Sequence, residues 1–452
     1  MKFRKLTAAL ICAAMTLTPM SSYAYADETA AEETADRSAA GTVGISENSD
    51  AEAGVPVSGG QDMAADQAGI SQDSADTAES ADRSQPSGAA ADESADVTPE
   101  AVPADGTADE DEVLIGETRY WVSPWYEGDL SELTPDLSGI QAQDTSVPSV
   151  TASTEEEALA AFKQMLMDRE EAFYITYVSA EAIDLDDFIN SAYAHTGEPT
   201  EGDYLRFSIQ GTGYSYRGSY AGGGKYAITY SFTVIPYSTS AQESALTTEL
   251  TSVMAGLNLE GKSDYQKVKL IYDYILEHVT YDHDHLNDSS YLTQFTAYAA
   301  LINGTAVCQG YALLLYRMLL TAGIDCRIIS GIANGGGHAW NIIKLGDYYY
   351  NADATWDVSP HKYGYYYYFL KGDASDNTFV TSHDRALNDA VLSYYQQIAD
   401  ANGVNISDVY NAGTDIDYSG EAFYTSYPMA SADYDPSHTH SWGEYVSDDN
   451  AT

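Results

Sequence analysis

The chain of 452 residues is poor in basic residues, in cysteine and in long apolar runs. Against 69 Asp and Glu residues stand only 20 Lys and Arg residues, which gives a formal net charge of −49 at pH 7. Such a charge repels phosphate groups and argues against nucleic acid or an anionic membrane surface as a partner. The 3 cysteines are too few for a disulfide-stapled scaffold or for a zinc cluster built on thiolates. After the amino end no segment approaches the roughly 18 apolar residues of a membrane-spanning helix, so no integral membrane span is expected.

The first 26 residues have the layout of a secretory signal peptide. Basic residues near the start are followed by an apolar run over residues 6–17, and small residues at Ala24 and Ala26 offer a cleavage site. The run is too short to cross a bilayer. We therefore expect residues 1–26 to be removed and the mature protein to be secreted, either extracellular or associated with the cell surface.

Residues 27–115 are predicted to form a long disordered acidic spacer rich in Ala, Ser, Asp and Glu. Between residues 27 and 112 there are 23 acidic residues and two basic ones, and no aromatic residue occurs between Tyr25 and Tyr120. Such a segment cannot bury enough apolar surface to offset the entropy of ordering it, and its like charges repel one another. The spacer is either a tether that holds the folded part away from the cell surface or a solvating leader without a specific partner.

Residues 116–240 are predicted to fold as a small α+β domain. Thr154 followed by three glutamates is typical of a capped helix start, and the β-prone residues 172–178 follow that helix. Residues 204–236 alternate apolar and polar positions on both sides of a glycine-rich turn, as hairpins do. Nothing in this segment has the spacing of a catalytic site.

From residue 241 the pattern becomes helical, and we assign residues 241–434 to a second domain. Ser263 with Gln266 three residues later is a capping signal, and apolar residues then recur at three- and four-residue spacing up to Val279. A His/Asp cluster at residues 281–285 follows that helix. Neighbouring residues of one loop rarely converge on a single ion, so we expect neither a metal nor another cofactor here.

Cys308 lies where a strongly apolar helix is predicted to begin. The unpaired backbone N–H groups and the positive dipole end at a helix amino terminus favour a thiolate over a thiol. Two other interpretations are open: a small buried cysteine that fills the core, or a disulfide to Cys326. A helix over residues 308–321 spans on the order of 20 Å, whereas a disulfide needs Cα atoms within about 7 Å of each other. Geometry therefore disfavours the disulfide and keeps the two thiols apart.

His338 and Asp353 lie on the two arms of a predicted β-hairpin that turns at Gly346 and Asp347. In that register His338 pairs with a residue near Thr355, which puts Asp353 on the same face as its diagonal neighbour. A carboxylate beside an imidazole fixes its tautomer and stabilises its protonated form. Each of the two residues alone is more often structural, but the chain order Cys, His, Asp is that of a papain-like thiol site.

Three motifs together resemble the transglutaminase-like superfamily, and in particular its exported bacterial members: Val307-Cys308-Gln309-Gly310-Tyr311-Ala312, Gly337-His338-Ala339-Trp340-Asn341 and Asp353-Ala354-Thr355-Trp356-Asp357. The resemblance covers about residues 241–385, and residues 424–434 read as a closing strand of the same domain. It implies an α+β fold with a papain-like core, in which a helix that begins at the cysteine packs on an antiparallel sheet carrying His and Asp. It also implies that Cys308 is the nucleophile, that His338 is the general base and acid, and that Asp353 orients His338.

The reaction implied by the resemblance is acyl transfer on a peptide or protein amide, with a cell-wall peptide among the substrates considered. The Cys308 thiolate attacks the amide, and the resulting thioester passes to water or to an amine, which gives hydrolysis or an isopeptide cross-link. The backbone N–H of Cys308 is one expected oxyanion donor, and Gln294 is a candidate for the second.

The alternative is a non-catalytic surface module of the same fold that binds cell-wall polymers or proteins. Residues 363–369, which include four consecutive tyrosines, would then supply an aromatic binding platform. The same residues also read as a strand packed half in the core.

The carboxyl end of the chain is less informative. Residues 389–401 are predicted to form a short helix, and residues 435–452 are either a tail or the start of a truncated repeat. Without the +3 of residues 1–26 and the −21 of residues 27–112, a net charge of −31 remains for residues 113–452. The folded part is thus strongly acidic itself, and we expect it to attract amine-bearing peptides.

Overall fold

The structure is a computed structural model that describes residues 113–123, 126, 128–142, 146–286, 288, 290–386, 389–409 and 417–437. The predicted signal peptide, residues 27–112 of the predicted spacer and residues 438–452 of the predicted tail lie outside these residues. The described part is mixed α+β, as predicted from the sequence. None of its helices is long and apolar enough to cross a membrane.

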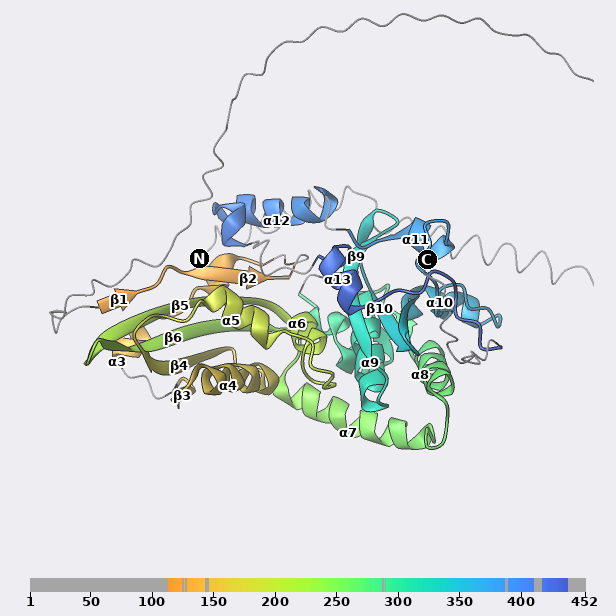
Figure 1. The fold of residues 1–452 in the computed structure, drawn as a ribbon, viewed down its shortest axis with the longest axis horizontal. Helices are drawn as coiled ribbons and strands as arrows, with labels where there is room; N and C mark the ends of the chain where they lie inside the picture. Colours follow the sequence, from red (N-terminus) through yellow and green to blue (C-terminus); the bar gives the residue numbers. More distant parts are fainter. Residues whose placement is uncertain are drawn as a thin grey trace, which may run out of the picture. The chain divides into compact units, whose positions relative to one another are not determined.

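The first half of the described chain forms a six-stranded sheet in which β1, β5, β6, β4 and β3 are neighbours in that order and β2 also pairs with β5 (Figure 1). Its strands are β1 (Val113–Ile115), β2 (Arg119–Val122), β3 (Ser149–Ala152), β4 (Ala172–Ser179), β5 (Ile209–Gly222) and β6 (Lys225–Pro236). The predicted hairpin is confirmed over residues 209–236, because β5 and β6 pair antiparallel as far as Gly222 and Lys225. Residues 204–208, which were predicted to belong to it, are helical instead. The predicted boundary between the spacer and the folded part, at residue 115, lies too late in the chain. Residues 113–115 pair with β5 and are part of the sheet.

Five helices occur in the described part of this half. They are η1 (Leu130–Leu133), α3 (Ser138–Ala142), α4 (Glu155–Asp168), α5 (Leu185–Ala192) and α6 (Asp203–Ser208). Two of them, α4 and α5, contribute phenylalanines to the core of the sheet. The predicted helix start is confirmed: the Thr154 side chain accepts a hydrogen bond from the N–H of Glu157 at the beginning of α4. The ring of Phe162 on α4 lies 5.7 Å from Phe173 and 4.8 Å from Phe232, centroid to centroid, so helix and sheet share one apolar layer.

The second half packs helices against a four-stranded antiparallel sheet with the order β11-β10-β9-β12. Before this sheet come α7 (Ser240–Gly256), α8 (Asp264–His278), β7 (Thr280–Tyr281), η2 (Leu292–Phe295), η3 (Ala299–Asn303), β8 (Thr305–Ala306) and α9 (Cys308–Thr321). The sheet itself comprises β9 (Cys326–Ala333), β10 (Gly336–Leu345), β11 (Tyr348–Ala352) and β12 (His383–Asp384). The remaining helices are α10 (Ala354–His361), α11 (Thr378–Ser382), α12 (Asp389–Asn402), η4 (Ile406–Asp408) and α13 (Glu421–Ser426).

The helix that begins at Cys308 is the centre of this half. Every residue of α9 from Gln309 to Leu320 is buried, which explains why its sequence is apolar on all sides rather than along one stripe. Helix α8 packs beside it and begins, as predicted, with a reciprocal capping box between Ser263 and Gln266. This packing fixes the position from which the Cys308 side chain projects.

Two predicted strands are wrong. Residues 363–369 form an irregular segment, because the backbone N–H groups of Tyr367 and Tyr368 donate to the Asp357 carboxylate instead of to a strand partner. Residues 424–434 are not a regular strand either: they begin inside helix α13 and make a single parallel bridge, from Met429 to Tyr349 on β11.

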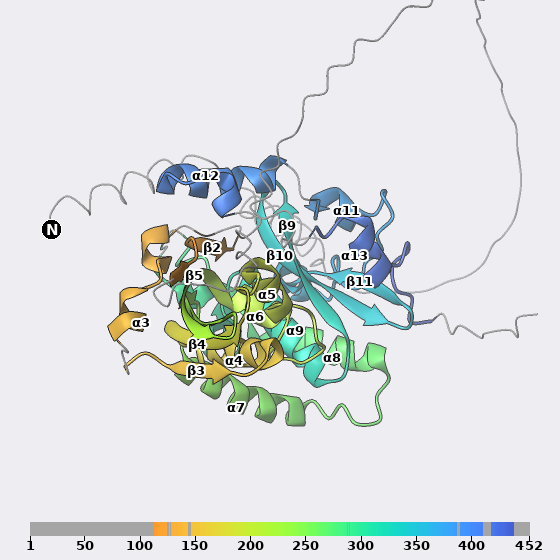
Figure 2. The ribbon, with the colours of Figure 1, turned by 60° about the vertical axis from the view of Figure 1, so that its left-hand side comes forward.

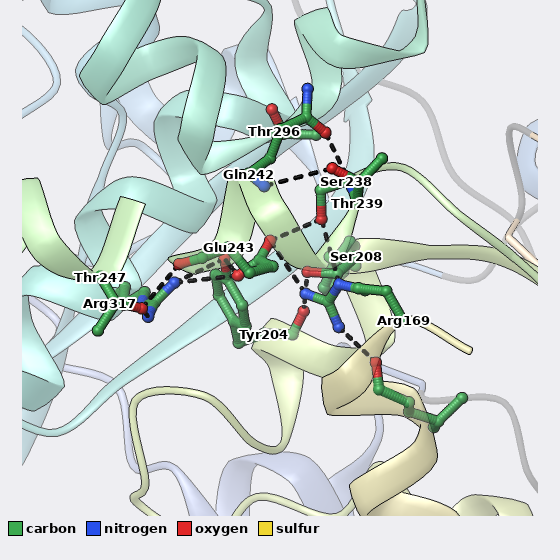
Figure 3. Close-up of polar contacts among 12 residues, drawn as sticks. Arg169, Tyr204, Ser208, Ser238, Thr239, Gln242, Glu243, Thr247, Thr296 and Arg317 are labelled. Carbon is green, nitrogen blue, oxygen red and sulfur yellow. Dashed lines mark hydrogen bonds and ion pairs between the residues drawn. The ribbon is translucent and has the colours of Figure 1, made fainter. Parts of the chain in front are cut away.

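Buried ion pairs join the two halves of the described chain. Figure 3 shows Glu243 of α7 between Arg169, at the end of α4, and Arg317 of α9. Both N···O distances are 3.1 Å, and the Tyr204 hydroxyl of α6 donates to the same carboxylate at 2.7 Å. Helix α12 also returns to the first half: it lies beside β2 in Figures 1 and 2, and its Val391 belongs to the same apolar cluster as residues of β2 and η1.

Candidate active site

Cys308 is the first residue of α9, as the sequence predicts, and its side chain is half-buried. The carbonyl of Gln294 accepts a hydrogen bond from the N–H of Val307 at 3.1 Å and so holds the residue just before the helix. Gly310 lets the first turn of α9 lie close to the preceding chain. A Cβ at this position would lie 2.7 Å from the Cβ of Ala306 and 2.9 Å from the carbonyl oxygen of Thr296. The helix can therefore begin tightly against the preceding chain and present the thiol at its amino terminus.

Cys326 is free and fully buried, and it is not bonded to Cys308. Its thiol donates to the carbonyl of Arg327 at 3.6 Å. Burial raises the pKa of the Cys326 thiol well above its ordinary value, so this sulfur stays protonated. The prediction that the two thiols stay separate is confirmed.

His338 lies on β10 and is held next to the Cys308 helix. The predicted hairpin is confirmed, with Leu345 paired to Tyr348 around a two-residue turn. Asn341, three residues beyond His338 on the same strand, donates to the carbonyl oxygen of Ala312 on α9 at 3.1 Å. That bond ties the strand that carries the imidazole to the helix that carries the thiol.

Asp353 contacts His338 by a route that differs from the predicted one. The observed pairing of Asn341 with Ala352 is the predicted register, but the strand ends there and Asp353 becomes the N-cap of α10. Its Oδ1 accepts from the N–H of Thr355 at 2.9 Å, which leaves Oδ2 for the Nε2 of His338 at 2.8 Å. The carboxylate is thus fixed by the N-cap hydrogen bonds at the start of a helix.

The electrostatics of this cluster favour a charged imidazole. Burial alone would lower the pKa of His338, but the Asp353 carboxylate and the Cys308 side chain, to which His338 is hydrogen-bonded, raise it to about 10. Burial would raise the pKa of Asp353, but His338 and then His383 hold it well below its usual range. Because Nε2 of His338 faces Asp353, the other ring nitrogen is the one available to Cys308. The arrangement can stabilise a thiolate–imidazolium pair backed by a carboxylate.

A second histidine, which sequence reasoning missed, contacts the same carboxylate. His383 on β12 places its Nε2 3.2 Å from Oδ2 of Asp353, and its ring stacks on Phe379 at a centroid distance of 4.0 Å. Burial holds the pKa of His383 below its ordinary value, so this ring is neutral. A carboxylate oxygen only accepts, hence His383 must carry its proton on Nε2 and donate it to Asp353.

The aromatic side chains of Trp340 and Trp356 lie against the two histidines, His338 and His383. The ring of Trp356 lies 5.5 Å from His338 and 4.5 Å from His383, and Trp340 lies 5.1 Å from His383. Trp340 is nearly fully buried. Apolar walls of this kind keep water away from the ion pair and strengthen its electrostatics.

His338, Asp353 and His383 are also the group of described residues whose ligand atoms lie within 4.8 Å of one another, close enough to hold a metal ion. In the structure both imidazole Nε2 atoms are at hydrogen-bond distance from one carboxylate oxygen. Metal binding would need the lone pairs of these nitrogens and would break both bonds. In the predicted His/Asp cluster that follows α8, Asp282 accepts from Nδ1 of His285 at 2.9 Å. The donor geometry thus favours hydrogen bonding in both clusters.

Gln294, the candidate for a second oxyanion donor, is buried in η2 below the start of α9. Its side-chain Nε2 donates to the carbonyl oxygen of His285 at 3.3 Å. The contact of Gln294 that reaches the Cys308 helix is made by its backbone carbonyl, through Val307. Gln294 therefore supports the helix start, and its side chain is turned to another partner.

Asp357, one turn after Asp353, should make the free energy of unfolding depend on pH. The Asp357 carboxylate accepts hydrogen bonds from the Tyr272 hydroxyl, at 2.9 Å, and from the backbone N–H groups of Tyr367 and Tyr368. Burial raises the pKa of Asp357 to about 7. A raised pKa means that the folded state binds the proton more tightly, so the stabilisation is present below the ordinary pKa near 4 and is lost as the pH rises through about 7. Asp357→Asn should therefore flatten the decline in unfolding free energy between pH 5 and pH 8, measured by urea denaturation.

The exposed turn residue Asp347 offers the matched control for this measurement. Asp347→Asn should leave the pH dependence of the wild type unchanged. If Asp357→Asn keeps the full wild-type slope, the assignment of the raised pKa to Asp357 is wrong.

Comparison with known proteins covers the three predicted site residues, Cys308, His338 and Asp353. Residues 252–354 match the family model of the transglutaminase-like superfamily. Kyphoscoliosis peptidase of Mus musculus is 27% identical over 164 residues, which are 32% of this chain and 24% of that protein, and the Homo sapiens protein is 27% identical over 154 residues, 30% and 23%. The chain thus spans about a quarter of the length of the curated relatives that it matches.

A solved structure described as a crystal structure of a TGase is 17% identical, with a TM-score of 0.26, and the match covers 60% of this chain and 79% of that one. That TM-score is too low to support an argument, so the family assignment depends on the sequence match. The match includes Cys308, His338 and Asp353 and ends before His383. The chain therefore contains a domain of the transglutaminase-like superfamily, and the Cys308, His338 and Asp353 cluster lies within it.

Proposed function

We propose that this protein is an exported cysteine enzyme that performs acyl transfer on peptide amides through a thioester on Cys308. The observation that carries the proposal is the buried His338, which is hydrogen-bonded to Cys308 on one side and to Asp353 on the other. A half-buried thiol at a helix amino terminus, beside an imidazole whose charge is stabilised, is the arrangement that activates a cysteine nucleophile. The family match supports the same assignment.

In the first half of the proposed reaction the Cys308 thiolate attacks the amide carbon. The carbonyl oxygen becomes an oxyanion, which the backbone N–H of Cys308 at the start of α9 stabilises. When the C–N bond breaks, the His338 imidazolium gives its proton to the departing amine or ammonia, and a thioester with Cys308 remains. Asp353 keeps the imidazole oriented and stabilises its charge before the transfer.

In the second half His338 is neutral and acts as the base. It removes a proton from water or from an incoming amine, which attacks the thioester carbon, and Cys308 leaves as a thiolate. Water gives a carboxylic acid, and an amine gives a new amide. Both curated relatives are named peptidases, which favours hydrolysis as the main outcome.

The charge of the chain supports peptides that carry amines as the substrate class. Residues 113–452 have a net charge of −31, which attracts cationic groups toward the protein. An exported enzyme meets cell-wall peptides, which contain both amides and free amines. We therefore propose cell-wall peptides and secreted proteins as the first substrates to test.

The experiment compares the wild-type protein with Cys308→Ala on a cell-wall digest and on a peptide pool. Mass spectrometry of the products should find hydrolysed or cross-linked amides with the wild type and none with the variant. Cys326→Ala is the matched control and should keep the activity, because this buried thiol is separate from the site. Equal product formation by wild type and Cys308→Ala would refute the thioester mechanism.

A binding module of the same fold is the second candidate. Tyr363, Tyr365 and Tyr367 are each more than half exposed, and the rings of Tyr365 and Tyr367 stack at 5.7 Å with an interplanar angle of 7°. Exposed stacked rings suit a polymer ligand better than a core role. Binding of a cell-wall digest that is unaffected by Cys308→Ala but lost in Tyr365→Ala, without turnover in any variant, would favour this function.

His383 gives a prediction that follows from the proposed mechanism. His383→Phe keeps the stack on Phe379 but removes the N–H that Asp353 accepts, so turnover should fall by about 10- to 100-fold, the value of one hydrogen bond to a charged group. Because His383 acts on Asp353 and not on the substrate, kcat should fall with little change in KM. The acidic limb of the pH–rate profile should also move upward, since the carboxylate loses a donor.

The matched control for this prediction is His278→Phe, which replaces an exposed histidine at the end of α8. It should leave the turnover and the pH profile unchanged. A His383→Phe variant that folds and has the wild-type kcat and acidic limb would show that the second histidine has no part in positioning Asp353.

A further inference from the structure

A buried arginine in the first half of the chain has no carboxylate partner among the residues that the structure describes. Arg206 on α6 is 8% exposed, and among the described residues its guanidinium makes one long hydrogen bond, from Nη2 to Oδ1 of Asn190 at 3.4 Å. Every other buried arginine of the described chain is paired with an acid; these are Arg169, Arg317, Arg327 and Arg385. A buried charge without a partner is costly, so Arg206 is an exception that needs an explanation.

Two N–H groups around Arg206 lack hydrogen-bond acceptors. The guanidinium of Arg206 lies over the rings of Trp121 and Tyr193, at 5.7 and 5.4 Å from their centroids. Among the described residues, Nε of Arg206 and Nε1 of Trp121 are buried without a partner, and the buried hydroxyls of Tyr193 and Thr212 have only each other. Native proteins satisfy nearly all such atoms, and here two donors without an acceptor come together beside two hydroxyls that can still donate.

The fold brings these four side chains to one place from four elements. Trp121 on β2 is the direct cross-strand partner of Thr212 on β5, so the two side chains share one face of the sheet. The ring of Tyr193, at the end of α5, lies 4.8 Å from the ring of Trp121, and Arg206 comes from α6. Each of the four residues is at least nine-tenths buried.

The chemistry of these atoms selects the kind of ligand. A guanidinium and an indole N–H only donate, and a hydroxyl can donate, so the set can satisfy an acceptor and repels a cation. Water would accept some of these bonds but would leave the charge of Arg206 without compensation. The planar fork of an arginine fits two oxygens of a carboxylate, sulfate or phosphate.

We propose that Arg206, Trp121, Tyr193 and Thr212 bind a small oxyanion, meaning a carboxylate, sulfate or phosphate of few atoms. The burial of all four residues restricts the ligand to this size. This binding site is separate from Cys308 and does not depend on the proposed catalytic function.

The site has a structural connection to the Cys308 helix through α6. Phe207, next to Arg206, accepts a hydrogen bond through its carbonyl oxygen from Nε2 of Gln309 at 2.8 Å. Asp203 of the same short helix pairs with Arg327 of β9, with N···O distances of 2.6 and 2.8 Å. An anion that fixes Arg206 therefore stabilises the element on which the start of α9 rests.

Thermal unfolding of the purified protein tests the proposal. Chloride, acetate, phosphate and sulfate are compared at equal ionic strength, after dialysis against buffer that contains chloride as its inorganic anion. The midpoint Tm of the wild type should rise by several degrees in a saturable manner at millimolar concentrations of at least one oxyanion. The response should be absent in Arg206→Met, and the anion with the lowest half-saturating concentration identifies the preferred ligand class.

Arg169→Met is the matched control, since Arg169 is equally buried but has Glu243 as its partner. Its Tm should be lower at every anion concentration, yet it should keep the wild-type rise. If Arg206→Met does not fold, Trp121→Phe removes only the indole N–H and should raise the half-saturating concentration several-fold. Ion chromatography of the dialysed, acid-unfolded wild type detects an anion too tightly bound to titrate, at one equivalent per chain. A wild type that releases no anion and whose Tm no oxyanion changes, or an equal rise in Arg206→Met, would overturn the proposal.

Discussion

His338→Gln is expected to lower the turnover of a peptide amide by about 10²- to 10⁴-fold, the usual contribution of a general acid–base group. The substitution removes the side chain that holds the proton for the leaving amine and that stabilises the Cys308 thiolate. Glutamine can still donate to Asp353, so the loss should reflect the chemistry and not collapse of the local fold. The rate is measured on a peptide amide that the wild type converts.

The pH dependence of the same reaction separates this role from a structural one. With the pKa of His338 at about 10, the protonated imidazole persists through neutral pH, and acylation should decline only as the pH rises through that value. His278→Gln, at the exposed end of α8, is the control and should retain the wild-type rate and profile. Near-normal turnover by a folded His338→Gln variant would exclude His338 as the acid and base.

Glu243→Gln is expected to lower the free energy of unfolding by about 3–5 kcal/mol, because it leaves buried charges without compensation. Figure 3 shows why the effect should be large: a single carboxylate serves both Arg169 and Arg317, and it also accepts from Tyr204. Both guanidinium groups are almost fully buried. Urea denaturation at pH 7 gives the measurement, with the slope compared between variants to check that the transition stays two-state.

The matched control is Glu201→Gln, which removes a carboxylate from a more exposed pair with Lys163 at 3.0 Å. This pair is partly buried but serves a single cation, so the variant should lose much less stability than Glu243→Gln. If the two variants lose the same small amount of stability, the buried cluster does not hold the two halves together.

The sequence predicted those features that depend on near neighbours. The start of α9 at Cys308, the capping box of Ser263 with Gln266 and the turn at Gly346 each depend on a few adjacent residues. The register of the β10–β11 hairpin followed from that turn, and it put Asp353 near His338 in advance. Local rules were therefore sufficient to bring Asp353 near His338. The link of these two residues to Cys308 came from the chain order and the family resemblance, because it depends on the packing of β10 against α9.

The features that the sequence did not predict depend on contacts between distant residues. His383 lies 30 residues after Asp353 and reaches it only because β12 adds to the edge of the sheet beside β9. The tyrosine-rich residues 363–369 have the composition of a strand, but Asp357 takes the backbone N–H groups that a strand would need. The lack of an acidic partner for Arg206 among the described residues is invisible to pattern analysis, since ion pairing depends on contacts between distant residues.

The most direct test of the proposed mechanism is the alkylation of Cys308 and Cys326 by iodoacetamide at about pH 5.5, followed by peptide mapping. A thiolate stabilised by His338 reacts at this pH, whereas an ordinary thiol, with a pKa of about 8.5, is almost entirely protonated. Rapid labelling is expected at Cys308 and almost none at Cys326, which is buried and whose pKa is raised. Equal labelling of the two residues would contradict the proposed mechanism. So would a Cys308 that is labelled only when the pH approaches the pKa of a free thiol.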